Sequence, residues 1–97
     1  MKKVKCKESV IRQQCIENEG AEYRYMLIVK ESESVTSYRM PLYSIQIEMV
    51  DNLGGHTEAR ASDIFSDVGK AIVFYDRMVR NLATPIDLPY IIEDEIR

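Results

Sequence analysis

The sequence has little of the chemistry that most enzyme active sites use. Its 97 residues include one histidine, His56, and two cysteines, Cys6 and Cys15. It contains no G-x-S-x-G nucleophile turn and no C-x-x-C or H-x-x-x-H spacing that would suggest a zinc site. We therefore expect no serine triad, no metal and no cofactor, and our first interpretation is a non-enzymatic protein.

A cysteine and the histidine could still meet across a sheet, because neighbours in space need not be neighbours in sequence. Either Cys6 or Cys15 beside His56 would make a small thiol enzyme, whose thiol would have to be reactive at neutral pH. A free cysteine is more often a simple packing residue. The thiol enzyme is therefore the weaker alternative.

Two further patterns resemble ligand sites only superficially. Glu93, Asp94 and Glu95 could offer oxygen ligands to a hard cation, but consecutive carboxylates on a helix point in different directions and are typical of a solvated face. Gly54 and Gly55 lack the surrounding residues of a phosphate-binding loop and follow a predicted strand. We interpret the glycine pair as a turn.

Long hydrophobic runs are also absent. The longest runs, such as Ala71 to Tyr75, have five residues, whereas a membrane-spanning helix needs about 18. The lysines at the start are not followed by the apolar stretch of a secretory signal. Cys6 and Cys15 would lie about 30 Å apart on one extended strand, too far for a disulfide. We expect a cytoplasmic protein with reduced thiols and no membrane segment.

Charge is distributed unevenly along the chain. Residues 1–7 carry four lysines and no acid, whereas the remaining residues carry nine bases and 16 acids, a balance of −7. The basic arm, together with tyrosines that could stack on bases, makes nucleic-acid binding an alternative function. The acidic remainder would repel a polyanion, and alternating lysines also protect an edge strand from aggregation. The lysines of this arm are Lys2, Lys3, Lys5 and Lys7.

The clearest strand is predicted over residues 43–50, where apolar and polar residues alternate with a period of two. Its apolar face would carry Tyr43, Ile45, Ile47 and Met49. Asn52 and the two glycines that follow can adopt the positive φ of a tight reversal, so residues 56–62 should pair antiparallel with this strand.

The N-terminal half is predicted to be mainly extended. Residues 23–29 are rich in strand formers and resemble a central strand. Residues 30–37 are polar and predict a loop, after which residues 38–41 resume extended structure, with Pro41 limiting the ladder there. Residues 3–16 predict one long strand, whose alternation changes phase at Val10 and Ile11 and so indicates a bulge or break.

Helical periodicity is confined to the end of the sequence. Apolar residues at spacings of three and four predict a helix from Val68 to about Leu82, with Ser66 as N-cap and Asp67 in its first turn. Pro85 cannot continue this helix. A second, short helix is predicted with Asp87 as N-cap and an apolar side that includes Leu88.

Together these elements predict one α+β domain over residues 1–97. Its architecture would be an antiparallel β-meander of about four to five strands, packed on one C-terminal amphipathic helix with a short terminal helix beyond it. The composition, 45% hydrophobic and 30% charged, is that of an ordinary globular chain that folds around one core.

Several apolar side chains exceed what a small monomer needs to bury, and they predict a contact surface for another protein or for a second copy in a homodimer. The alternative is that the terminal segments cover them. The candidate residues lie on the predicted central strand and on the flank of the long helix: Tyr23, Tyr25, Met26, Ile28, Val73 and Phe74.

The C-terminal half also carries a recurring arrangement, in which a helix ends at Asn81, a Thr84-Pro85 pair follows, and an apolar segment closes on Glu93-Asp94. In this the chain resembles a family of short, uncharacterised proteins of clostridia and related Firmicutes. The resemblance implies kinship over about half of the chain. It brings no known activity, ligand or catalytic residue.

Overall fold

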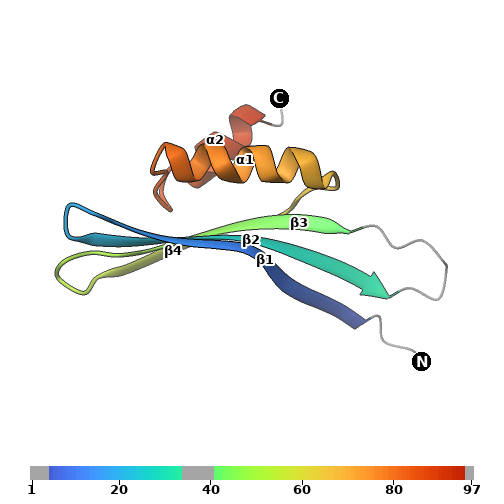
Figure 1. Ribbon diagram of the computed structural model, residues 1–97, viewed down its shortest axis with the longest axis horizontal. Helices are drawn as coiled ribbons and strands as arrows, with labels where there is room; N and C mark the ends of the chain where they lie inside the picture. The colour runs from blue at the N-terminus through green and yellow to red at the C-terminus, as the bar shows by residue number, and fades with distance from the viewer. Residues whose placement is uncertain (1–4, 34–40, 96–97) are drawn as a thin grey trace.

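The computed structural model describes the backbone over residues 5–33 and 41–95 and the side chains over residues 8–31 and 41–95. Four antiparallel strands form one sheet in the order β1-β2-β3-β4, and two helices cover one of its faces (Figure 1). The elements are β1 (Lys5–Asn18), β2 (Ala21–Glu33), β3 (Leu42–Val50), β4 (His56–Phe65), α1 (Val68–Arg80) and α2 (Leu88–Glu95).

This architecture confirms the α+β class and the meander, with two refinements. The described residues form four strands, not five. Both helices pack on the sheet, because α2 contacts β4 and its Leu88 is buried in the same core as α1. The prediction that only the longer helix covers the sheet was wrong. Residues 34–40, which include most of the extended segment predicted over residues 38–41, lie outside the described residues.

The core lies between the sheet and the helices. The predicted apolar face of β3 is confirmed, since Ile45 and Ile47 are fully buried. In register beside them on β2 lie Leu27 and Tyr25. The helices contribute the rest of the fully enclosed side chains: Ala71, Phe74, Tyr75, Met78 and Leu88.

The two N-terminal strands are longer than predicted and form one hairpin. β2 extends to Glu33, so residues 30–33 of the predicted loop are strand instead, because pairing with β1 satisfies the backbone of this polar segment. The rest of the predicted loop lies outside the described residues. Glu19 and Gly20 join the strands, both with positive φ, as a two-residue hairpin turn requires. The predicted bulge is confirmed: the register shifts between Val10 and Arg12.

A second irregularity lies near the end of β4. Asp63 has a φ of 57°, and the register with β3 shifts between the Tyr43 and Ile45 pairs. The hydroxyl of Ser44 accepts a hydrogen bond from the backbone N–H of Asp63 at 2.9 Å. The bulge turns the end of β4 so that Ile64 and Phe65 both pack against the core.

Helix α1 begins at Val68 as predicted, but its N-cap lies one residue later than predicted. Asp67, rather than Ser66, is the N-cap, and its carboxylate accepts the backbone N–H of Lys70. At the other end Leu82 has a φ of 51°. The N–H groups of Leu82 and Ala83 bond to the carbonyls of Val79 and Met78, which is the Schellman arrangement, here with leucine at the position usually taken by glycine.

Helix α2 begins directly after Asp87, the predicted N-cap, whose carbonyl accepts the N–H of Ile91. The turn before it has a reciprocal pair of its own: the hydroxyl of Thr84 accepts the N–H of Asp87, and the carboxylate of Asp87 accepts the N–H of Thr84. These are the bonds of a capping box, and Pro85 follows Thr84 at a position where its missing N–H costs nothing. The spacing of threonine and aspartate in the sequence could have predicted it.

Candidate functional site

The predicted contact residues do not form a common surface. Tyr25 and Phe74 are buried in the core, 0% and 1% exposed, because their strand and helix faces meet there. Ile28 lies on the opposite face of the sheet and is nevertheless only 6% exposed. These three residues are therefore corrected: in this chain they are packing residues and are not available to a partner.

The other three candidates are accessible but separate. Tyr23 is half-buried on the helix-covered face, where its ring stacks on that of Tyr25 at 6.3 Å. Met26 is half-buried on the opposite, open face of β2. Val73 is 65% exposed on α1. The structure thus brings none of the three into contact with another to form a patch.

The open face of the sheet is largely polar, and charged side chains cross it. Glu8 on β1 pairs with Arg60 on β4, although β2 and β3 lie between these strands. Lys30 on β2 pairs with Asp63 at 3.1 Å. Ile28 and Ser44 occupy the neighbouring central strands and are buried, which fits side chains that lie across them. This face is a second, smaller packed layer.

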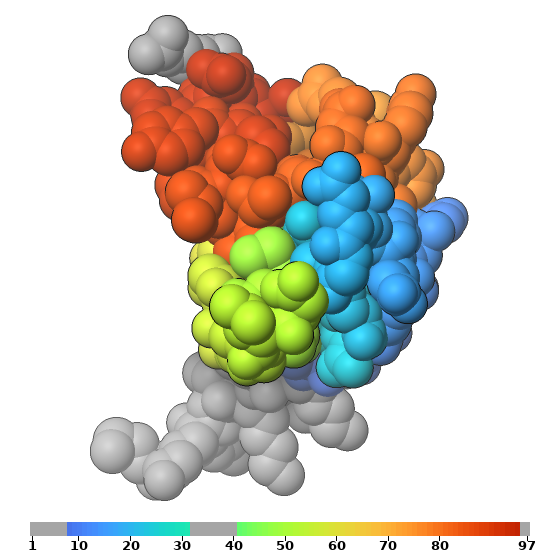
Figure 2. Space-filling view, turned by 90° about the vertical axis from the view of Figure 1, so that its left-hand side faces the viewer, coloured from blue at the N-terminus to red at the C-terminus, as the bar shows by residue number. Residues whose placement is uncertain are grey.

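Apolar side chains are exposed together at the side of the molecule where α2 lies over β4. Ile86, in the turn before α2, and Tyr90, on α2, are 69% and 68% exposed. Pro89 is also exposed, whereas Leu88 on the other side of the helix is buried. Figure 2 shows the chain of α2 stacked above the β3–β4 hairpin at one side of the molecule, with α1 on the other side.

The strand beneath this helix presents an unpaired edge. β4 pairs with β3 on one side, and none of the described strands lies on its other side. We call the exposed residues Ile86, Pro89 and Tyr90, together with the outer edge of residues 56–62, the α2–β4 flank. Our sequence analysis missed it, because Ile86 lies in the turn before α2 and only Pro89 and Tyr90 lie on the helix itself.

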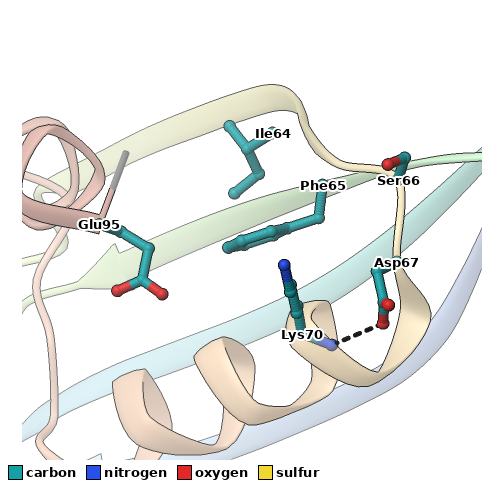
Figure 3. Close-up of a pocket in the computed structure, with 6 residues that line it drawn as sticks. All are labelled: Ile64, Phe65, Ser66, Asp67, Lys70 and Glu95. Atoms are coloured by element: carbon teal, nitrogen blue, oxygen red, sulfur yellow. Dashed lines mark hydrogen bonds between the residues drawn. The ribbon is translucent and has the colours of Figure 1, made fainter. Parts of the chain in front are cut away.

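A pocket opens near the C-terminal end of α2. Its cavity volume is about 460 Å³, and it is lined by Ile64, Phe65, Ser66, Asp67, Lys70 and Glu95. Figure 3 shows the side chain of Lys70 pointing up toward the ring of Phe65, with the carboxylate of Glu95 farther to the left. Both acidic side chains of the pocket have structural roles: Asp67 caps α1, and Glu95 pairs with Arg77 on α1.

The aromatic rings beside the pocket belong to the core. Phe65 and Phe74 lie 5.3 Å apart with a tilt of 56°, and the guanidinium of Arg77 lies 5.5 Å from the centre of the Phe74 ring. Arg77 therefore joins α1 to α2 through Glu95 while it covers this aromatic pair. The pocket is a gap between three element ends held by these contacts.

The buried tyrosines link the helices to the sheet. The hydroxyl of Tyr25 donates to the carbonyl of Ala83 at 2.8 Å, and the hydroxyl of Tyr75 donates to the carbonyl of Tyr25 at 3.1 Å. Burial, with smaller contributions from the negative charges of Tyr23 and Asp87, raises the pKa of Tyr25 to about 12. Burial also raises the pKa of Tyr75, so both hydroxyls stay protonated and serve as donors at neutral pH.

A family model matches the whole of this chain, residues 1–97, and describes a family of unknown function, DUF6514. The chain belongs to DUF6514. The match includes the N-terminal hairpin, so the kinship extends beyond the C-terminal half on which the resemblance depended; the clostridial origin stays a prediction. No curated protein and no solved structure gives a significant match.

The DUF6514 fold does not assemble the predicted thiol pair. Cys15 is exposed on β1, and His56 begins β4, so β2 and β3 separate them. Adjacent strands lie about 4.8 Å apart, which places the two edges roughly 14 Å from each other. Cys6 pairs with Ser32 toward the other end of β1, still farther along the strand from His56. The Cys–His hypothesis is therefore wrong for this arrangement.

The remaining sequence candidates in this DUF6514 chain have no assembled site in the described part. No group of three acidic, histidine or cysteine side chains among the described residues could hold a metal ion. Within the same residues no helix is both long and apolar enough to span a bilayer. Of the lysine arm, Lys2 and Lys3 lie outside the described residues, and Lys5 and Lys7 are described only as backbone in β1.

Proposed function

We propose that this chain is a non-enzymatic protein-interaction domain of the cytosol, which binds another protein or itself through the α2–β4 flank. The observation that carries the proposal is the position of Ile86 and Tyr90. Both are large and more than two-thirds exposed; Tyr90 lies on α2, over a strand whose outer edge is unpaired among the described strands, and Ile86 lies in the turn that leads into this helix.

Two physical effects would favour binding at this flank. Burial of apolar surface contributes about 25 cal/mol for each Å², and tyrosine is among the residues that most often dominate an interface. An unpaired strand edge offers backbone N–H and C=O groups to an extended partner segment. At this flank, apolar side chains would therefore contribute binding energy through burial, and the strand edge would orient the partner through backbone hydrogen bonds.

The contact residues selected from the sequence support the proposal only in part. Tyr23, Met26 and Val73 remain accessible, and none lies on α2 or β4. Val73 is useful as a comparison, because it has nearly the same exposure as Tyr90 on a different helix.

The test is a photo-crosslinking comparison in the native cell. A photoreactive phenylalanine analogue would replace Tyr90 in one variant of the full chain and Val73 in another. We expect a discrete crosslinked protein product from position 90, which is lost when Ile86→Glu is added, and none from position 73. Equal crosslinking from both positions, or none from position 90, would contradict the proposal.

A further inference from the structure

We propose that the occupant of the α2–β4 flank is a second copy of this chain, joined by antiparallel pairing of β4 with its counterpart about a two-fold axis at Ala59. This inference rests on the proposed function and identifies the partner. The two sheets would become one continuous sheet with both α2 helices on the same face.

The two edges of the sheet differ in their ability to accept a strand. β1 contains the bulge between Val10 and Arg12, which divides its edge into residues 5–10 and 12–18, and α2 with its exposed side chains contacts the other edge strand, β4. β4 is regular from His56 to Ala61, since its register with β3 is continuous over these residues, and its bulge comes only at Asp63. The edge of residues 56–61 is therefore regular and available for pairing.

The charges of this edge are self-complementary in one register. With Ala59 opposite Ala59, Glu58 of each copy lies opposite Arg60 of the other, on the same face of the sheet. Opposite charges that face each other across antiparallel strands stabilise the pair. Centring the axis on Glu58 would place two glutamates opposite each other, and centring it on Arg60 would oppose two arginines. The sequence thus selects the register at Ala59.

The side chains on both faces are compatible with this pairing. On the helix-covered face the edge carries only small residues, Thr57, Ala59 and Ala61, which leave space beneath the helices. On the open face Arg60 already pairs with Glu8 of its own copy. A guanidinium has five N–H donors, so it can bond to Glu8 and to Glu58 of the second copy together.

The helices reinforce the same geometry. α2 lies over β4, so a two-fold axis perpendicular to the sheet brings the two α2 helices side by side and antiparallel above the strand seam. Pro89 and Tyr90 on α2 and Ile86 in the turn before it are exposed, whereas Leu88 faces the core. Pairing of the strands would therefore bury these exposed side chains between the helices.

A charge-complementation experiment tests the register directly. In sedimentation of the full chain over a range of concentrations, we expect the unmodified protein to form a dimer. In a dimer of the Glu58→Lys variant, the four side chains that face one another at positions 58 and 60 are all positive. In a dimer of the Arg60→Glu variant, they are all negative. Each variant alone should therefore dimerise about tenfold or more weakly. Mixed in equal amounts, the two variants restore both opposite-charge pairs and should form a heterodimer.

The matched control is Glu17→Lys, which makes the same charge change at an exposed position on β1; its dimer should be unaffected. Thermal unfolding of each variant establishes that it is folded. A monomer at every concentration, or a dimer weakened by Glu17→Lys and not by Glu58→Lys, overturns the inference. A monomer whose position 90 crosslinks to a different protein overturns only the identity of the partner, whereas a monomer without any crosslink overturns the proposed function as well.

Discussion

Two tyrosine hydroxyls make the buried polar contacts between the helices and the sheet. Tyr25 is fully buried on β2 and donates to Ala83, at the end of α1, while Tyr75 on α1 donates back to the carbonyl of Tyr25. No buried side-chain nitrogen or oxygen among the described residues lacks a hydrogen-bond partner. These hydroxyls therefore fix the position of α1 without leaving a polar group unsatisfied.

The raised pKa of Tyr25 predicts a specific loss of stability in alkali. Its pKa is about 12 in the folded chain against 10.0 for an ordinary tyrosine. The unfolded chain therefore ionises first, and the stabilisation, complete below pH 10, is lost as pH rises toward 12. In urea unfolding, Tyr25→Phe should reduce this alkaline loss, while it lowers the free energy of unfolding at pH 7 by about 1 kcal/mol.

The comparison for this prediction is Tyr90→Phe, which removes a hydroxyl from an exposed tyrosine. It should keep the alkaline loss of the unmodified protein. Equal alkaline sensitivity of the unmodified protein and Tyr25→Phe would show that the buried hydroxyl does not carry the effect. Tyr75, whose pKa is also raised, accounts for the part of the loss that remains.

At the scale of single elements, the ends of the helices are defined by short hydrogen-bonded motifs. Asp67 begins α1, a Schellman motif around Leu82 ends it, and the capping box of Thr84 and Asp87 begins the turn into α2. The Schellman motif ends at Ala83 and the reciprocal pair begins at Thr84, so no residue separates them. This short connection reverses the chain and holds α2 against β4.

The N-cap of α1 provides a direct test, because two neighbouring residues are chemically suitable. Asp67→Ala removes the acceptor for the N–H of Lys70 and should lower the free energy of unfolding by about 1 kcal/mol. Ser66→Ala should change it by less than about 0.5 kcal/mol. Chemical denaturation measures both values. A larger effect at Ser66 would return the cap to the residue that the sequence favoured.

At the scale of the whole molecule, the sheet has two packed faces of different kinds. The helices cover one face with aromatic and aliphatic side chains, whereas ion pairs from β1, β2 and β4 lie across the other. Ile28 is buried on the second face, opposite Val10 of β1 in register. The pair offers a comparison of two apolar side chains on one face at different depths.

Truncation of Ile28 should therefore have an effect typical of a core residue. Ile28→Ala should lower the free energy of unfolding by about 2–4 kcal/mol, because it leaves a cavity under the ion pairs. Val10→Ala, at a residue that is 49% exposed, should cost less than about 1 kcal/mol. The midpoint and slope of urea unfolding give both values. Similar losses for the two variants would mean that the open face is not packed.

Much of the fold follows from local patterns. The alternation in residues 43–50, the phase change at Val10 and Ile11 and the helical spacing after Val68 correctly predicted a strand, a bulge and a helix. These signals are visible because one face of each element is buried and the period of the side chains records it. The start of α2 directly after Asp87 was also predicted, but the reciprocal pair of Thr84 and Asp87 in the preceding turn was missed.

The chain alone determined its strands, its helices and the apolar stripe of each, because these depend on residues close together in sequence. Only the tertiary structure decided which apolar residues stay exposed. Tyr25, Ile28 and Phe74 became core, while Ile86 and Tyr90 stayed at the surface, since burial depends on which distant elements pack together. The α2–β4 flank exists for the same reason: the short turn after α1 places α2 over an edge strand about 30 residues earlier in the chain.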